Sequence, residues 1–260
     1  MSGRRRVVME LLAVVLAATF VTVGIGGLGG SGAALTPHQA QARTESVLLV
    51  GDSLLHQAAA GMTAALPGSS VVDASVPGSG LLNGGVDWYA RAEALVEQYH
   101  PDVVVVSFVG NYDRSSATLV VDSPEYYDAW NAAAQRLTDR FRAAGARVDW
   151  VVQPPLHDPN FYGVPTTRPQ ELSKQYATLA RQPGVDLLDA VAAVSAADGG
   201  FAEQGTICGS TVTLRIADGV HFTAAGAAWW GVHLARALAR LDGLAATGTC
   251  TAMSGLDRAA

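Results

Sequence analysis

The hydrophobic positions of this 260-residue chain follow two patterns beyond about residue 45. Short, nearly continuous runs of valine and leucine are typical of strands buried on both faces of a parallel sheet. The longer amphipathic stretches between them are typical of helices that pack on such a sheet. Together the patterns predict strands over residues 46–50, 70–74, 103–109, 147–152 and 185–188, and helices over 54–66, 88–99, 124–144, 170–181 and 223–241.

The regular alternation of strands and helices predicts the fold class. It favours an α/β protein, a three-layer α/β/α sandwich with a central, mainly parallel sheet and right-handed crossovers. Residues 46–245 form one predicted domain, and residues 246–260 read as a C-terminal tail. Ser123 is a good N-cap for the 124–144 helix. Residues 153–169 hold five prolines and predict a long irregular loop, and 185–188 is expected at a sheet edge.

The N-terminal segment has the pattern of a targeting sequence. Three arginines, Arg4 to Arg6, precede a largely apolar run over residues 7–28, and a Gly/Ala/Gln-rich linker follows over 29–45. This predicts a signal peptide or signal anchor over residues 1–28. Cleavage after a small-x-small site, at residues 31–33 or 40–42, and retention as a membrane anchor through residues 7–28 both remain open. Either outcome places the domain outside the cytoplasm.

Composition and cysteine content narrow the function classes. The net charge is −6, only 15% of residues are charged, and no basic stripe appears, so nucleic acid is not an expected partner. The two cysteines are Cys208 and Cys250, and in an exported chain such a pair predicts a disulfide; two free buried thiols are the alternative. Neither a Cys-x-x-Cys motif nor a histidine cluster accompanies them, so no metal and no cofactor is expected.

Candidate chemistry lies in two distant segments. Gly51-Asp52-Ser53-Leu54 directly follows the first predicted strand, which places Ser53 at the carboxyl edge of the sheet, where open α/β folds bind ligands. Far along the chain, Asp218 and His221 are three residues apart. Serine needs a base, and that base needs an orienting acceptor, so the three predict a hydrolytic triad. Simpler alternatives are a helix cap for Ser53 and a surface turn for the other two. Asp52 either supports the nucleophile loop by hydrogen bonds or is merely solvated.

Four separated segments resemble the conserved blocks of the SGNH hydrolases, also called the GDSL esterase/lipase family. The segments are residues 51–54, 73–78, 110–113 and 218–221 with the following Thr223-Ala224-Ala225-Gly226. The resemblance implies a flavodoxin-like fold and an oxyanion hole made by Ser53, Gly78 and Asn111, with Gly80 as the alternative to Gly78. Asn111 departs by one residue from the family's Gly-x-Asn-Asp pattern, and Asp113 is expected to fix that loop.

The resemblance implies an extracytoplasmic serine esterase that cleaves an O-acyl ester, on an acylated glycan or lipid of the cell envelope, through a Ser53 acyl-enzyme. One alternative is an O-acyltransferase acting on an envelope sugar, with a membrane protein as acyl-donor partner. Another is a catalytically silent glycan-binding module on the same fold. In the proline-rich loop, Phe161 and Tyr162 are candidates for stacking on an acyl chain or sugar ring, and Arg168 for binding an anionic group.

Overall fold

The computed structural model describes residues 44–82, 85–112 and 118–259. The predicted targeting segment, the linker up to residue 43 and Asp113 lie outside the described residues. Within the described ranges, none of the helices combines the length and apolar character needed to cross a lipid bilayer.

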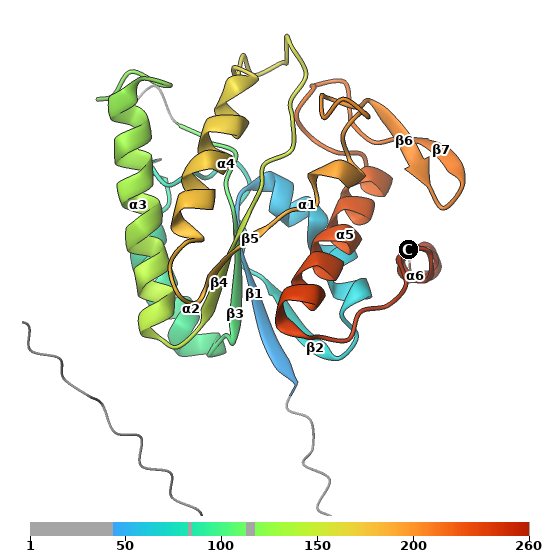
Figure 1. The fold of residues 1–260 in the computed structure, drawn as a ribbon, viewed down its shortest axis with the longest axis horizontal. Helices are drawn as coiled ribbons and strands as arrows, with labels where there is room; N and C mark the ends of the chain where they lie inside the picture. The colour runs from blue at the N-terminus through green and yellow to red at the C-terminus, as the bar shows by residue number, and fades with distance from the viewer. Residues whose placement is uncertain (1–43, 83–84, 113–117, 260) are drawn as a thin grey trace, which may run out of the picture. The chain divides into compact units, whose positions relative to one another are not determined.

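A parallel five-stranded sheet forms the centre of the domain (Figure 1). Its strands are β1 (Glu45–Gly51), β2 (Ser69–Asp73), β3 (Val103–Ser107), β4 (Arg147–Val151) and β5 (Val185–Leu188). They lie in the order β2-β1-β3-β4-β5, and every neighbouring pair is parallel. This order is the flavodoxin-like one, so the predicted fold class is confirmed, as is the edge position of β5.

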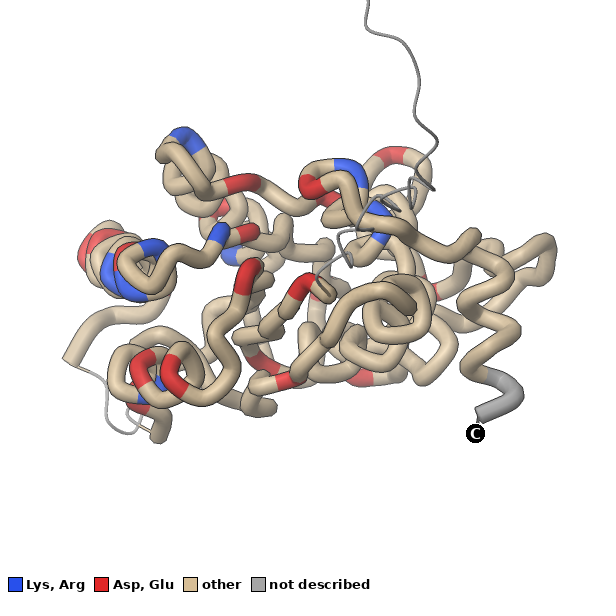
Figure 2. Tube along the Cα trace, turned by 90° about the horizontal axis from the view of Figure 1, so that it is seen from below, with Lys and Arg blue, Asp and Glu red and all other residues tan. Residues whose placement is uncertain are grey.

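Two helical layers cover the sheet because successive strand residues face opposite sides. Val47 and Leu49 of β1 pack into one core, with α1 (Ser53–Ala65), α5 (Ala224–Asp242) and α6 (Thr249–Ala259). Leu48 and Val50 pack into the other core, with α2 (Trp88–Tyr99), α3 (Pro124–Ala143) and α4 (Thr167–Leu179). Acidic and basic residues are interspersed along α2, α3 and α4 (Figure 2), whereas α1 contains neither kind.

Glycines allow α1 and α5 to pack closely, and this packing positions the N-termini of both helices. A Cβ atom on Gly231 would lie 2.0 Å from the Ala58 carbonyl oxygen, and one on Gly61 would lie 2.2 Å from the Ala228 carbonyl oxygen. Backbone therefore meets backbone at this crossing. The contact fixes the N-terminus of α1, which begins at Ser53, relative to the N-terminus of α5, capped by Thr223.

The structure differs from the sequence-based expectation at the C-terminus. Residues 246–260 are not a tail: most of them form α6, whose Ala252 and Met253 are buried against α1 and α5. An unpredicted hairpin of β6 (Gln204–Ile207) and β7 (Ser210–Thr213) turns through Cys208 and Gly209, both with positive φ. The expected disulfide between Cys208 and Cys250 is present and joins this hairpin to α6.

Helix α4 begins at Thr167, three residues before the expected start. Proline is tolerated in the first turn of a helix, where its missing N–H has no intrahelical partner, so Pro169 does not exclude an earlier start. The correction places Arg168 in the first turn of α4 rather than in the irregular loop. The loop that remains is the connection from β4 to Thr166.

Candidate active site

Ser53 lies where β1 gives way to α1. Only glycine fits at position 51, the last residue of β1, because a Cβ atom there would lie 2.3 Å from the Ser107 carbonyl oxygen of the neighbouring strand. Asp52 then caps α1, its carboxylate accepting a hydrogen bond from the Leu54 N–H at 3.1 Å. Ser53 consequently occupies the first helical position at the carboxyl edge of the sheet, where the helix N-terminus favours negative charge.

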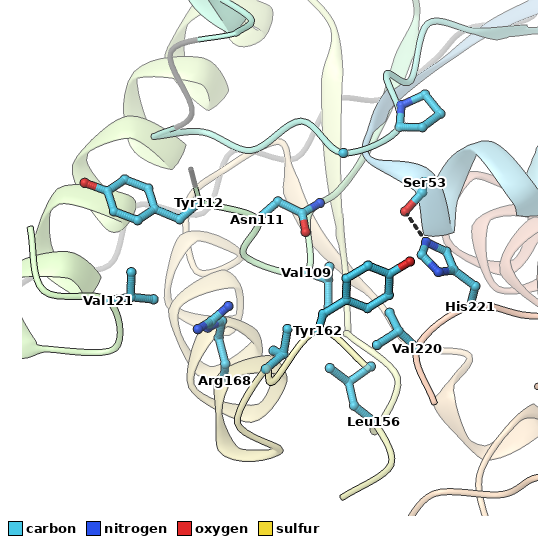
Figure 3. Close-up of a pocket in the computed structure, with 13 residues that line it drawn as sticks. Ser53, Val109, Asn111, Tyr112, Val121, Leu156, Tyr162, Arg168, Val220 and His221 are labelled. Atoms are coloured by element: carbon cyan, nitrogen blue, oxygen red, sulfur yellow. Dashed lines mark hydrogen bonds between the residues drawn. The ribbon is translucent and has the colours of Figure 1, made fainter. Parts of the chain in front are cut away.

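The structure brings Ser53, His221 and Asp218 together (Figure 3 shows the Ser53–His221 contact). Ser53 Oγ lies 2.8 Å from His221 Nε2, and His221 Nδ1 lies 2.7 Å from Asp218 Oδ2. The other carboxylate oxygen accepts the backbone N–H groups of Val220 and His221, each at 2.8 Å. Partial burial acts to raise the pKa of Asp218, but these hydrogen bonds outweigh it and hold the pKa below its ordinary value.

The turn that carries Asp218 and His221 is built around Arg215. Its buried guanidinium donates to the carbonyl oxygens of Val220 and Pro155 and lies 3.7 Å from the centroid of the Phe222 ring. It thereby ties the turn to the loop after β4. Sequence reasoning missed this residue; the available signal was a lone arginine between Leu214 and Ile216, three residues before Asp218.

The loop after β4 docks on the same turn through its backbone. The His157 N–H donates to the Gly219 carbonyl and the Phe161 N–H donates to the Asp218 carbonyl, both at 2.9 Å. Gly219 has φ +74°, a conformation that favours glycine, and a Cβ atom there would lie 2.7 Å from that of His157. The turn that carries Asp218 and His221 is therefore held both by Arg215 and by the backbone of the loop after β4.

The oxyanion candidates Gly78 and Asn111 line the same cavity as Ser53. Gly80 is not among the residues that line the cavity and packs against the backbone of Asn111, where a Cβ atom on Gly80 would be 2.0 Å from the Asn111 carbonyl oxygen. That placement favours Gly78 over Gly80 as a backbone donor. The Asn111 side-chain amide donates to the Ser79 carbonyl at 3.0 Å and, at 3.4 Å, to the Asp52 carboxylate.

Asp52 joins the nucleophile loop to the segment after β3. It is fully buried, and beyond its cap to Leu54 it accepts the Val109 N–H at 2.7 Å and the weaker bond from Asn111. Burial raises its pKa to about 6, although the hydrogen bonds from Val109 and Leu54 oppose the rise. Of the two interpretations left open by the sequence, the structure supports the first, in which Asp52 organises the loop.

The three residues proposed for substrate recognition are placed differently from one another. Tyr162 lines the cavity, and its ring lies 5.7 Å from that of His221. Phe161 packs edge-on against Tyr162 but is 81% exposed and is not among the residues that line the cavity. Arg168 lines the cavity, but its Nε and Nη2 each lie 2.6 Å from an oxygen of Asp122. This pairing corrects the expectation that Arg168 awaits an anionic substrate group.

The cavity has a volume of about 530 Å³. Beside the polar groups near Ser53, its wall contains a set of aliphatic and aromatic side chains: Val109, Tyr112, Val121, Leu156, Tyr162, Val164 and Val220. In the part of the chain that the structure describes, no group of three or more His, Cys, Asp or Glu residues could hold a metal ion.

Comparison with solved structures finds the same fold. A G-D-S-L family protein from Desulfitobacterium hafniense DCB-2 superposes with a TM-score of 0.54 at 16% identity, covering 75% of this chain and 99% of that one. The periplasmic domain of a lipopolysaccharide acetyltransferase from Salmonella ser. Paratyphi A gives 0.52 at 13% identity, covering 76% and 84%. A carbohydrate esterase family 2 enzyme from Corynascus thermopiles gives 0.51 at 17% identity, covering 78% and 68%. These likenesses show the SGNH hydrolase fold.

No curated protein matches the sequence. A family model described as "Protein of unknown function (DUF459)" matches residues 46–244, which span the sheet and the helices through α5. The chain therefore belongs to the DUF459 family, and its domain has the fold of the SGNH hydrolases.

Proposed function

We propose that this protein is an extracytoplasmic serine esterase that cleaves an O-acyl ester through a Ser53 acyl-enzyme. The observation that carries the proposal is the continuous line from Ser53 Oγ through His221 to Asp218, with contacts of 2.8 and 2.7 Å, at the wall of a 530 Å³ cavity. A surface turn or a helix cap does not account for such an alignment of residues 168 positions apart.

The geometry supports each step of acyl transfer. With its proton on Nδ1, His221 donates to Asp218 and accepts the Ser53 hydroxyl proton at Nε2, so that Oγ attacks the ester carbonyl carbon. The negative charge that develops on the carbonyl oxygen meets the backbone N–H groups of Ser53 and Gly78. The Asn111 amide joins them with the hydrogen that makes the weaker, 3.4 Å bond to Asp52, and each such donor is worth on the order of 3 kcal/mol. His221 then protonates the leaving alkoxide, and water or another hydroxyl releases the acyl group from Ser53.

Separate observations support the proposed cellular location and the proposed substrate. The arginine-led apolar segment supports export, and the Cys208–Cys250 disulfide fits an oxidising compartment. Two proteins of the same fold are named for activities on saccharides, a lipopolysaccharide acetyltransferase and a carbohydrate esterase. We therefore place the substrate among acylated glycans or lipids of the cell envelope. The first of these likenesses also favours an O-acyltransferase as the second candidate, since the two reactions share the triad and differ in the acceptor.

The decisive experiment compares the purified domain with its Ser53→Ala variant. A fluorophosphonate probe is expected to label Ser53 and no other serine, and the variant is expected to lose ester cleavage while its circular dichroism spectrum is unchanged. Mass spectrometry of products formed with and without sugar acceptors separates hydrolysis from transfer. Full activity in Ser53→Ala, or labelling at another serine, would overturn the proposal.

A further inference from the structure

The cavity beside Ser53 extends well beyond the space that the ester bond itself requires. We propose that it is an acyl-binding subsite for a neutral, unbranched acyl group of roughly six to ten carbon atoms, by the volume argument below. The inference rests on the proposed esterase function and goes beyond it by naming the acyl class.

The orientation of the substrate follows from where the charges and the leaving group must lie. The leaving alcohol lies beside His221, which protonates it, and the carbonyl oxygen lies toward Gly78 and Asn111. Figure 3 shows Ser53 and His221 at one end of the site, with Asn111 between them and Val121 and Arg168 at the other end. The space that leads away from His221 past Asn111 is therefore left for the acyl chain.

The side chains around this space are suited to an aliphatic chain. Five of the lining residues are aliphatic, Val109, Val121, Leu156, Val164 and Val220, and Tyr112 adds an aromatic ring at the far end. The Tyr112 hydroxyl already accepts the Leu119 N–H at 3.4 Å. A sugar ring needs several polar partners in its pocket, and this wall offers few of them, so the alcohol portion is better placed at the mouth beside Tyr162.

The volume of the cavity limits the length of the acyl chain. A methylene group fills on the order of 30 Å³, about the share of one water molecule in the liquid. An acetyl group would leave most of the 530 Å³ empty, whereas an acyl group of about eight carbons fills roughly half and leaves room for the alcohol at the mouth.

Among the described residues that line the far end of the cavity, the charge of Arg168 is balanced by an ion pair. Arg168 is 4% exposed, its guanidinium is paired with both oxygens of Asp122, and its Nη1 donates to the Gly110 carbonyl at 3.3 Å. A terminal carboxylate on the acyl chain would have to compete with Asp122 for that guanidinium. The subsite therefore selects a chain that ends in a methyl group.

The test is a series of p-nitrophenyl esters from acetyl to dodecanoyl. Each methylene contributes about 0.8 kcal/mol when fully buried, or about fourfold in kcat/KM, so the six methylenes added between acetyl and octanoyl set a ceiling of about 4 × 10³-fold. We expect a rise of at least about 10²-fold over that range and a plateau or fall beyond decanoyl. Val121→Phe, which fills the far end, is expected to lower the octanoyl-to-acetyl ratio of kcat/KM at least tenfold. Val120→Phe is the matched control, because Val120 is 77% exposed and does not line the cavity.

Several outcomes decide against the subsite. A wild-type profile that is flat or highest for acetyl overturns it without any variant. A preference for an acyl chain that ends in a carboxylate over one of equal length that ends in a methyl group also overturns it. So does a Val121→Phe variant whose activity changes only with the alcohol of a series of acetate esters, because Val121 would then contact the alcohol and not the acyl chain. If Val121→Phe fails to fold, Val164→Phe fills the same cavity from the loop after β4. If the wild-type protein cleaves none of the esters, acetyl included, and the fluorophosphonate probe does not label Ser53, the proposed esterase function is itself contradicted.

Discussion

Asp149 on β4 is a carboxylate that the fold buries fully. Neither of its carboxylate oxygens has a hydrogen-bond partner among the residues that the structure describes. Its pKa is raised from 3.8 to about 7, mainly by burial and in part by the nearby carboxylates of Asp242 and Asp186, while Arg147 opposes the rise. Arg147 itself is shared, since it bonds Asp242 at 2.9 Å and Glu45 at 2.8 Å.

The sign of the effect on stability follows from this rise. Below pH 3.8, Asp149 is protonated in both the folded and the unfolded chain. Between pH 3.8 and about 7 the unfolded chain ionises first, so the folded state loses free energy of unfolding as the pH rises, and the loss is complete above about pH 7. At 1.36 kcal/mol per pH unit, the difference between the two pKa values corresponds to about 4 kcal/mol.

We therefore expect Asp149→Asn, which cannot ionise, to gain stability relative to the wild type as the pH rises. The free energy of unfolding from urea titrations at pH 4, 5, 6, 7 and 8 measures it, and the variant-minus-wild-type difference should grow by about 2–4 kcal/mol over that range. Asp52, whose pKa is also raised, is present in both proteins, so its contribution cancels. Asp139→Asn is the matched control, because that side chain is 55% exposed. A difference that stays constant with pH would refute the reasoning.

Other parts of the structure give sharper mutational tests. Asn111→Ala is expected to lower kcat by roughly 10²–10³ with a small change in KM, measured by steady-state kinetics; near wild-type kinetics would remove Asn111 from the oxyanion hole. Gly231→Ala inserts a methyl group 2.0 Å from a backbone carbonyl of α1 and is expected to lower the melting temperature severely, whereas Gly255→Ala in α6 meets nothing within 4 Å and should be neutral or mildly stabilising. Equal effects of the two would refute this packing argument. Reduction of the Cys208–Cys250 bond, which spans 42 residues, should lower the free energy of unfolding by about 4 kcal/mol, measured by urea titration with and without reductant; an unchanged midpoint would contradict this.

The central sheet could be predicted from the sequence because its signal is local and strong. Strand β3 lies in a run of valines that is buried on both faces, and the bounds of α2 and β5 match the prediction. Ser123 caps α3 by accepting the Tyr126 N–H at 3.2 Å, as its type and place indicate. In these elements, periodicity, caps and breakers agree with the tertiary packing.

Elements that depend on distant contacts could not be predicted in this way. The sequence of α6 is rich in Thr, Ser and Gly and has little helical preference of its own, and the helix is held by packing on α1 and by the disulfide from Cys250. The turn at Cys208 and Gly209 lacks the Asn-Gly or Asp-Gly pair that marks most two-residue hairpins. Tertiary structure decides both elements.

The residues of the candidate site also differ in whether local sequence or distant contacts determine their place. Ser53, Asp218 and His221 could be proposed because each lies in a short motif at a strand end or before a helix, where the geometry follows from the backbone. The partner of Arg168 could not, because Asp122 is 46 residues away and joins it only through the packing of the segment before α3 onto α4. Arg215 was missed for a similar reason: its acceptors are backbone carbonyls, which leave no trace in the side-chain pattern.

The residues of the triad and the residues of the apolar wall also differ in how freely they can be substituted. The triad is supplied by the start of α1 and by the turn that Arg215 and Gly219 hold in place. Most of the apolar wall comes instead from loops, with Tyr112 after β3 and Leu156 and Val164 after β4. Because loops tolerate substitution better than the buried strands and the glycine-packed helices, changes there alter the shape of the cavity without moving Ser53 relative to His221. If the proposed function holds, substitutions in these loops would change the acyl group that is accepted and leave the Ser53–His221–Asp218 geometry in place.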